Sequence, residues 1–309
     1  MGQRGAYNII EALFIDEGAS FGTTPTTGAW LPICVVNNID AKRVPTRIKK
    51  VGLGTQVPSD FKTTKHHWQA HLEHSLVKKQ TTPAFNWKTF YNMLLNLSGS
   101  NVPQDAPKSF SFGYKLDLAT DEFGWLKGGT IESYTIQGAE IDNAVKGIVD
   151  LIAHWGDYGI TDYVSGTATR QGKPTTEEIT FGECDLLYGL TSESSILSRL
   201  NSFSLVVKRE YQKRGTSTTD AKLYREFPPV SRNYELDLGI DFDSRTEYEH
   251  FIDDEDWTAT LKIPNASGGV QIALGGGHWL QGELPAREMD LLNLRLKGEC
   301  TSLTLTDIA

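Results

Sequence analysis

Residues 110–118 read Phe-Ser-Phe-Gly-Tyr-Lys-Leu-Asp-Leu, and this stretch decides the fold class. Large apolar residues occupy every second position from Phe110 to Leu118, and small or polar residues stand between them. Because successive side chains of a strand point to opposite faces, the alternation predicts a β-strand with one buried face. Similar patterns recur along most of the chain, so we expect a mainly β protein.

The remaining strands are predicted from alternation and from β-branched content. A strand at 145–155 competes with a helix by apolar spacing, and its β-branched residues favour the strand. No alternating series of strands and helices is visible, which argues against a doubly wound nucleotide-binding fold. The other predicted strands are 68–77, 130–137, 203–207, 234–242, 257–263, 270–274, 289–296 and 302–308.

Two short helices interrupt this pattern in similar surroundings. The first is predicted from about Asn86 to Leu97, and the second from Ser244, where the run Ser-Arg-Thr-Glu is typical of a capping box. Each follows a strand and precedes strands that include a Gly-Gly pair. The layout predicts one β-rich unit used twice, as two tandem antiparallel β-sandwich or barrel domains, each flanked by a helix.

The domain boundary is predicted within the Gly-, Thr- and Asp-rich residues 156–180. The first domain would span residues 1–170, with an extended N-terminal arm and a basic loop at 37–65, and the second residues 171–309. Gly52, Gly54, Pro45 and Pro58 are interpreted as turn residues of that loop.

Charge is distributed unevenly along the chain. The formal net charge is −9, yet residues 41–65 hold seven Lys or Arg against one Asp, which leaves −15 for the remainder. Either both segments are solvated surface, or they meet between neighbouring copies, since complementary patches steer association and fix register. The second interpretation gives these candidate stacking contacts: Lys42, Arg43, Arg47, Lys49, Lys50, Asp253, Asp254, Glu255 and Asp256.

Composition describes a folded, soluble protein made in a reducing compartment. Cys34, Cys184 and Cys300 are far apart and odd in number, and are interpreted as free thiols. No apolar run approaches the length of a membrane span, and the N-terminus lacks the hydrophobic core of a signal peptide. We expect no membrane insertion, and assembly in the cytoplasm of the producing cell.

A search for catalytic or metal-binding patterns leaves one cluster, His66, His67, His71 and His74. On a helix, three of these histidines would share a face and could hold zinc. The alternation of the neighbouring apolar residues instead predicts a strand, which would place His67 and His71 on one side and His74 on the other. We expect no metal, no cofactor and no enzymatic activity.

Other short motifs resemble known ligand-binding motifs but lack residues that those motifs require. Residues 275–278, Gly-Gly-Gly-His, lack the Lys-Ser/Thr of a phosphate-binding loop. Asp241 and Asp243 resemble the start of a calcium loop, but Thr246 stands where that loop needs glycine. The basic segment has no aromatic residue between Lys42 and Lys50 to stack on bases, so sequence-specific nucleic-acid binding is not expected.

Taken in order, these elements resemble the major tail tube proteins of tailed bacteriophages and archaeal tailed viruses, in the two-domain form found in long flexible tails. The resemblance covers nearly the full length. It rests on residues 16–25, the aromatic-led helix within 85–99, the strands 110–118 and 128–136, and the C-terminal strand 301–307.

The resemblance implies a structural protein of the virion, in which rings of subunits stack into a hollow tube and DNA passes through during injection. In that family the inner strands of a ring form a continuous barrel. Two units in one chain imply a trimeric, pseudo-hexameric ring, with a hexamer as the alternative. Implied partners are the tape-measure protein in the lumen, terminator and baseplate or tip proteins, and DNA in transit.

Two other interpretations stay open from the sequence. One is another ring protein of the same fold, such as a tail terminator or baseplate-proximal ring. The other is a two-domain carbohydrate-binding module with Trp68, Trp125 or Trp279 as stacking platforms.

Overall fold

The computed structural model describes residues 8–18, 20–33, 35–51, 58–77, 87–97, 108–117, 122–141, 143–171, 178–190, 192–215, 224, 226–241, 246–265, 268–283 and 293–308. Strands hold 72% of these residues, so the predicted mainly β fold is confirmed. The helices are α1 (Trp87–Leu94) and α2 (Thr246–Ile252), with two 3-10 turns at Phe181–Glu183 and Leu197–Arg199. The strands are β1 (Asn8–Asp16), β2 (Ala29–Pro32), β3 (Val35–Val51), β4 (Pro58–Ser75), β5 (Phe110–Asp117), β6 (Glu122–Ala139), β7 (Val145–Ile160), β8 (Thr169–Arg170), β9 (Asp185–Gly189), β10 (Ser194–Ser195), β11 (Leu200–Tyr211), β12 (Pro229–Asp241), β13 (Trp257–Asn265), β14 (Gly268–Glu283) and β15 (Asn293–Ile308).

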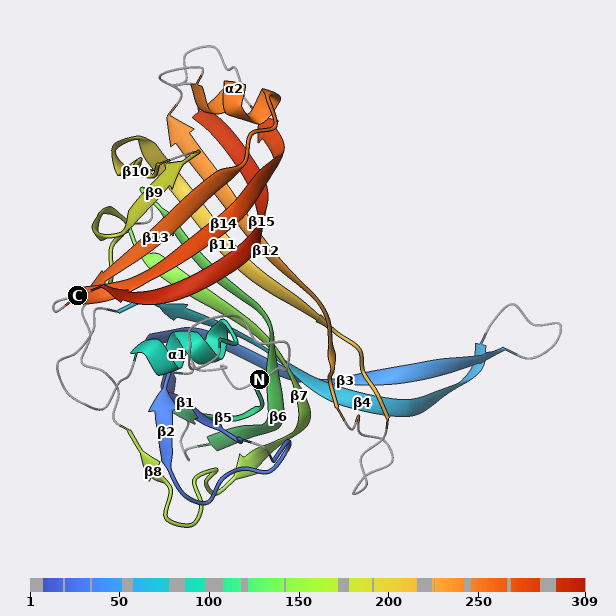
Figure 1. The fold of residues 1–309 in the computed structure, drawn as a ribbon. Coiled ribbons are helices and arrows are strands. Elements are labelled where there is room, and N and C mark those ends of the chain that lie inside the picture. The colour runs from blue at the N-terminus through green and yellow to red at the C-terminus, as the bar shows by residue number, and fades with distance from the viewer. Residues whose placement is uncertain are drawn as a thin grey trace, which may run out of the picture.

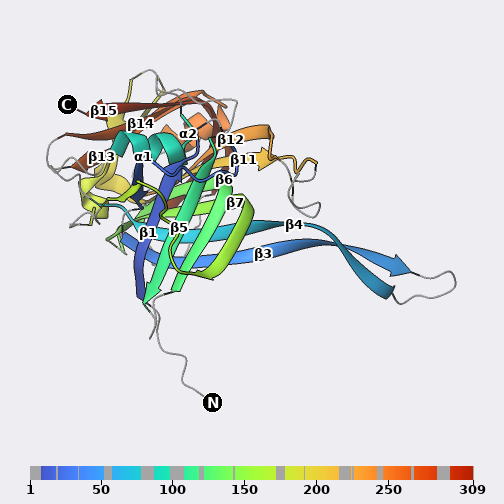
Figure 2. The ribbon, with the colours of Figure 1, turned by 90° about the horizontal axis from the view of Figure 1, so that it is seen from below.

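The strands form one hydrogen-bonded, strongly curved sheet (Figure 1). Its main path runs β10-β9-β13-β14-β15-β12-β11-β6-β5-β1-β2-β8, and a branch from β6 continues through β7 and β4 to β3. All described pairings are antiparallel except β2 with β8. Seen from below, α1 lies across the curled strands of the N-terminal half, and the β3–β4 hairpin extends far from the body (Figure 2).

The two halves of the chain have the same strand order. In the first half the order across the sheet is β2-β1-β5-β6-β7-β4-β3, and in the second it is β10-β9-β13-β14-β15-β12-β11. Each helix lies between the corresponding strands, α1 before β5 and α2 before β13. We refer to these sets of elements as unit 1 and unit 2. The fold is therefore one β-rich unit used twice, although the division at residue 170 stays a prediction.

Irregularities of the sheet recur at matching places. Between β5 and β6 the register shifts just after Phe110 pairs with Gly129, and between β13 and β14 it shifts just after Trp257 pairs with Gly277. A second bulge, at Glu132 in β6, has its counterpart at Leu280 in β14. Bulges are specific features of a backbone, so their recurrence aligns the two units residue by residue.

Turns and helix ends agree with that alignment. Gly128 and Gly276 have φ values of 60° and 59°, the left-handed region that glycine enters without steric cost. Asn96 and Asp254, each just beyond a helix, have φ values of 51° and 53°. The two helices therefore end in the same way, 158 residues apart.

One large hydrophobic core continues through both units. It includes Tyr91 and Leu94 of α1, Phe112 of β5, and Trp257 of β13, all with at most 1% of their surface exposed. A smaller core under β1 contains Trp30 and Tyr163, whose rings lie 4.8 Å apart. Burial of the apolar faces against each other is the main source of stability for such layers.

Several predictions of local structure need correction. The basic segment is not a loop: its described residues belong to β3 and β4, and Pro45 pairs with His66 inside that hairpin. Pro45 is accommodated because β3, within the described part of the chain, pairs on one side only, so no second ladder needs its missing N–H. Ser244 and Arg245 of the predicted capping box lie outside the described residues, and α2 begins at Thr246.

Candidate assembly surfaces

The two units are joined edge to edge by strands. Residues Ser133 to Ala139 of β6 pair antiparallel with Lys208 to Ser202 of β11, so the sheet of unit 1 continues into unit 2. We call this pairing the internal joint. On one side of it the side chains enter the core, as Phe203 and Leu205 do, and on the other side Ser202 and Ser204 stay half-exposed.

Packing makes the internal joint specific. The rings of Phe203 and Phe181 stack with centroids 5.9 Å apart, and Gly138 lies directly beneath them. A Cβ added at Gly138 would come within 2.9 Å of the Phe203 ring, so the close approach requires glycine. The buried Arg209 of unit 2 donates a hydrogen bond to the carbonyl of Leu95 after α1, which ties the helix of unit 1 to the joint.

The strands that correspond to the two sides of the internal joint have open edges. β3 corresponds to β11, and within the described residues it pairs with β4 alone. β14 corresponds to β6, and its pairing with β13 ends at Gly277, so the described residues 278–283 have a strand neighbour only in β15. Unpaired edges offer rows of backbone donors and acceptors to another strand.

The β3–β4 hairpin is the longest projection of the molecule (Figure 1). β7 pairs with β4 only from Trp68 to Ser75, so the outer part of the hairpin is a two-stranded ribbon. Such a ribbon has little stability in water unless another surface covers it. The predicted basic contacts lie along it: Lys42 and Arg43 near its base, then Arg47, Lys49 and Lys50, whose side chains are outside the described set.

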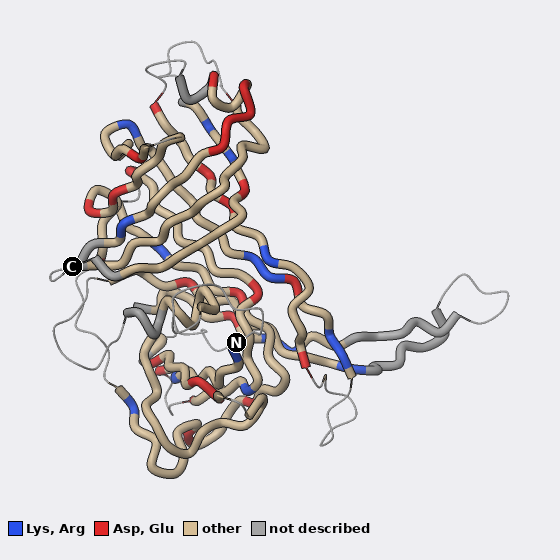
Figure 3. The backbone as a smooth tube through the Cα atoms, in the orientation of Figure 1, with Lys and Arg blue, Asp and Glu red and all other residues tan. Residues whose placement is uncertain are grey.

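The acidic run lies at the other predicted contact surface. Asp253 and Asp254 follow α2, and Glu255 and Asp256 lead into β13, with all four side chains exposed. The Asp256 carboxylate lies 3.1 Å from His278 Nδ1. The acidic run therefore lies at one corner of unit 2 (Figure 3), whereas the β3–β4 hairpin projects from a different end of the molecule (Figure 1).

A polar face runs across the strands on both sides of the internal joint. At its centre Glu235 of β12 accepts hydrogen bonds from Lys208 of β11 at 2.6 Å and from Lys297 of β15 at 3.2 Å. Burial of this carboxyl would raise its pKa, but the two lysines outweigh it and the pKa of Glu235 is lowered. Asn233 links Glu235 to Glu299, so the charges form a connected network.

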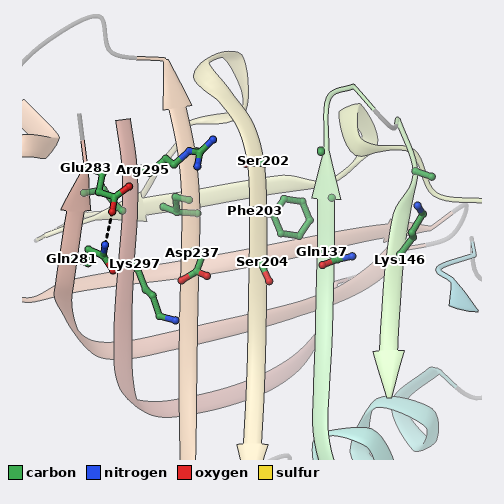
Figure 4. Close-up of a pocket in the computed structure, with 16 residues that line it drawn as sticks. Gln137, Lys146, Ser202, Phe203, Ser204, Asp237, Gln281, Glu283, Arg295 and Lys297 are labelled. Carbon is green, nitrogen blue, oxygen red and sulfur yellow. Dashed lines mark hydrogen bonds between the residues drawn. The ribbon is translucent and has the colours of Figure 1, made fainter. Parts of the chain in front are cut away.

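This face is hollowed where the two units meet (Figure 4). A groove of about 540 Å³ is lined by strands of both units, with Gln137 and Lys146 from unit 1. Asp237, Arg295 and Lys297 line it from unit 2. Charges of both signs around an open groove suit a hydrated surface.

The histidine cluster lies on a strand, as the apolar alternation predicted. His71 is half-exposed on the polar face, whereas His74 is fully buried and stacks on Tyr134 with ring centroids 6.0 Å apart. Burial lowers the pKa of His74 to about 4, and burial with the nearby Lys213 lowers that of His67 to about 4. Among the described residues, no group of three or more His, Cys, Asp or Glu could hold a metal ion.

Asp150 joins His71 to Ser133, but the geometry is not that of a nucleophilic triad. Asp150 Oδ1 lies 2.7 Å from His71 Nδ1, and its Oδ2 accepts a hydrogen bond of 2.7 Å from the Ser133 hydroxyl. A nucleophilic serine would have to contact the histidine itself. The arrangement is a cross-strand polar contact of β4, β7 and β6.

Two of the three proposed carbohydrate platforms are buried. Trp68 is 8% exposed, and Trp279 is 6% exposed and stacks on Trp257 at 4.5 Å. Trp125 is half-buried and contacts Trp155, with Lys127 over both rings. Burial of Trp68 and Trp279 removes the sequence basis for those two platforms.

The two described thiols are buried, and both described helices are short. Cys184 and Cys300 are buried and free, and burial raises the pKa of each to about 12, while Cys34 lies outside the described residues. Neither of the two described helices has the length and apolar content that crossing a membrane requires.

No family model and no curated protein matches this chain. Among solved structures, the chain is similar to one chain of the cryo-EM structure of the anti-feeding prophage (AFP) baseplate, 6-fold symmetrised. The identity is 8%, the TM-score is 0.32, and the match covers 44% of this chain and 97% of that chain. A similarity at this level carries no argument about function.

Sequence reasoning missed the internal joint and the two open edges. The only available signal was the spacing of the two helices, which also relates the strands around them. The strands themselves share too few residue types to reveal the match.

Proposed function

We propose that this chain is a structural virion protein whose copies form stacked rings, and that these rings make the hollow tail tube through which DNA passes. The observation that carries the proposal is the internal joint: one chain already links two like units through β6 and β11, and the counterpart edges on β14 and β3 are open. A head-to-tail contact that repeats with a rotation closes into a ring.

A trimer is the ring that we favour. If the contact between copies repeats the internal joint, three chains give six like units in a pseudo-sixfold ring, and a hexamer of chains is the alternative. Pairing β14 with β3 of the next copy would also cover these two open edges, which otherwise invite aggregation.

We assign the polar sheet face to the channel. The strands β3, β4, β7, β6, β11, β12, β15 and β14 lie side by side in that order, with one face in the core and the other carrying the network around Glu235. Carboxylates on this hydrated wall, such as Asp237 and Glu283, would repel phosphate and let DNA slide without being held. The tape-measure protein would occupy the same channel before injection.

The β3–β4 hairpin is our candidate for the contact between stacked rings, with residues Asp253–Asp256 as its acidic counterpart. The hairpin projects well beyond the unit and needs a covering surface. Charge reversal of both Lys49 and Lys50 should raise the protein concentration needed for tubes and change their salt sensitivity. Tubes that polymerise normally with unchanged salt sensitivity would contradict this role.

Terminator and baseplate or tip proteins would then close the two ends of the tube, in a virion assembled in the host cytoplasm. We propose no catalytic role and no cofactor.

Negative-stain imaging of the purified protein tests the proposal most directly. Hollow rods that lengthen with protein concentration are the expected result. Single rings that never stack would favour a terminator-like protein, and dispersed monomers at every concentration would overturn the proposal.

A further inference from the structure

The internal joint is a template for the contact between two copies, because the alignment of the units fixes the register. Ser202 of β11 pairs with Gly239, and Asn38 of β3 pairs with Glu73, each just after a bulge. From these positions Ser202–Lys208 correspond one by one to Asn38–Val44.

The other side of the joint aligns in the same way. Ser133 of β6 is the first residue after the bulge in its pairing with β7, and Gln281 of β14 is the first residue after the bulge in its pairing with β15. Thr135 therefore corresponds to Glu283. The residues after Glu283 that would continue the strand lie outside the described part of the chain.

From these equivalences we infer that β14 of one copy pairs antiparallel with β3 of a second copy, with Glu283 of one opposite Lys42 of the other. In the internal joint the same two positions hold Thr135 and Val206, which pair directly. This inference rests on the proposed self-assembly and specifies the contact between two copies. The contact has a charged pair at the positions where the internal joint has a neutral pair.

The charges on the two edges suit this pairing. The Lys42 side chain is 63% exposed, and among the described residues its ion-pair partner is Asp40 of the same strand, at a loose 3.9 Å. Glu283 is exposed, and the residue opposite it on its paired side is Arg295 of β15. Lys42 of a second copy would complete a row of alternating charge, Lys-Glu-Arg, and opposite charges facing each other across strands are favourable.

The helix beside each edge leaves room for a second strand. In unit 1, α1 packs on the buried face of β6, where the rings of Tyr91 and Tyr134 lie 6.4 Å apart, while β11 occupies the edge. In unit 2, Phe251 of α2 lies over Gly282 of β14 in the same way. The edge of β14 is therefore presented as that of β6 is.

Engineered cysteines test the register. Under mild oxidation the double variant Lys42→Cys/Glu283→Cys should give covalent oligomers that stop at the size of one ring. A mixture of the two single variants should give cross-linked dimers only, and each single variant alone should give none. The native Cys184 and Cys300 are buried and stay in every variant, so their contribution to cross-linking is the same throughout. Cross-linking of Lys42→Cys to itself, or none in the double variant, would overturn the inference.

Charge exchange tests the pair independently. Lys42→Glu or Glu283→Lys alone should raise the concentration needed for ring formation by roughly fivefold at low salt, and the double exchange should restore it. Asp117→Lys, an exposed strand residue away from both edges, is the matched control. Single variants that assemble like the control, or a double exchange without rescue, would contradict the pair.

The two proposals fail in different ways. Hollow rods that form without the Lys42–Glu283 cross-link would support the tail-tube proposal and contradict the proposed contact between β14 and β3. Cross-linked rings that never stack would support that contact and contradict the tail-tube proposal.

Discussion

His71 Nδ1 and Asp150 Oδ1 lie 2.7 Å apart across the pairing of β4 with β7. The hydrogen bond to Asp150, together with the nearby Glu73, raises the pKa of His71 above its ordinary value of about 6.5. A raised pKa in the folded state means that protonated His71 stabilises the protein below about pH 6.5. This stabilisation is lost as the pH rises through the raised pKa.

We therefore predict that Asp150→Asn loses more stability relative to wild type at pH 5.5 than at pH 8.5. The side chains are about 40% exposed, and solvent screening limits the pH-dependent part to about 1 kcal/mol or less. Urea unfolding at the two pH values measures this pH-dependent loss of stability. In a protein that also carries His71→Asn, the loss caused by Asp150→Asn should be the same at both pH values. Parallel stability profiles for wild type and Asp150→Asn would refute the contact.

His74 should act in the opposite direction. Its folded pKa of about 4 lies below the unfolded value of about 6.5, so its neutral form supports the fold above pH 6.5. That support should fall by up to about 3 kcal/mol as the pH drops from 6.5 towards 4. His74→Leu should flatten the acid limb of unfolding free energy against pH. An acid limb as steep as that of wild type would show that other groups cause it.

Gly128 and Gly159 form a matched pair for backbone strain. Both have positive φ, 60° and 67°, but a Cβ at Gly128 would meet His154 Cβ at 2.8 Å, whereas nothing lies within 4 Å at Gly159. Gly159→Ala should cost about 1–2 kcal/mol for the left-handed conformation alone. Gly128→Ala should cost about 1–3 kcal/mol more through the clash, as thermal and urea unfolding would show. Equal losses would mean that the neighbours of Gly128 move aside freely.

Glu17 should anchor the segment between β1 and β2. Only 4% of Glu17 is exposed, and its carboxylate accepts hydrogen bonds from the backbone of Gly22 and Gly128 and from the hydroxyls of Ser109 and Ser111. Glu17→Ala leaves buried donors without an acceptor and should cost about 1–3 kcal/mol or more. The exposed Glu140→Ala is the control and should change stability by less than about 0.5 kcal/mol. Similar losses in the two variants would contradict the anchoring role.

The fold class follows from sequence because each strand carries its own period-2 signal. The alternation at 110–118 predicts β5, which spans Phe110–Asp117, and the β-branched residues of 145–155 correctly favour the strand β7. The spacing of the two helices likewise pointed to a repeated unit. The prediction of a single buried face was wrong, because β5 is buried on both faces from Phe110 to Tyr114, with the small residues Ser111 and Gly113 on the second face. The alternation of large and small residues still identifies the strand.

The surfaces between units were not predictable in the same way. Pro45 is typical of a turn, yet an edge strand tolerates proline, so β3 continues through it. Gly52 and Gly54 lie outside the described residues. The neighbours of β6 and β11 are decided by pairing between residues some 70 apart, which leaves no trace in local periodicity. The equivalence of Thr135 with Glu283 emerges only from bulges and turn conformations, and side-chain identity does not record it.

In the proposed ring, the internal joint would supply half of the contacts between units within single chains, so that only the other half would need a second copy. Val206 and Thr135 belong to one polypeptide, so they meet at any dilution and need no charge to choose each other. Edges on separate chains meet only by diffusion and must reject wrong partners. Neutral residues would therefore be tolerated at the internal joint, whereas the contact between two chains would need complementary charges to select the correct partner.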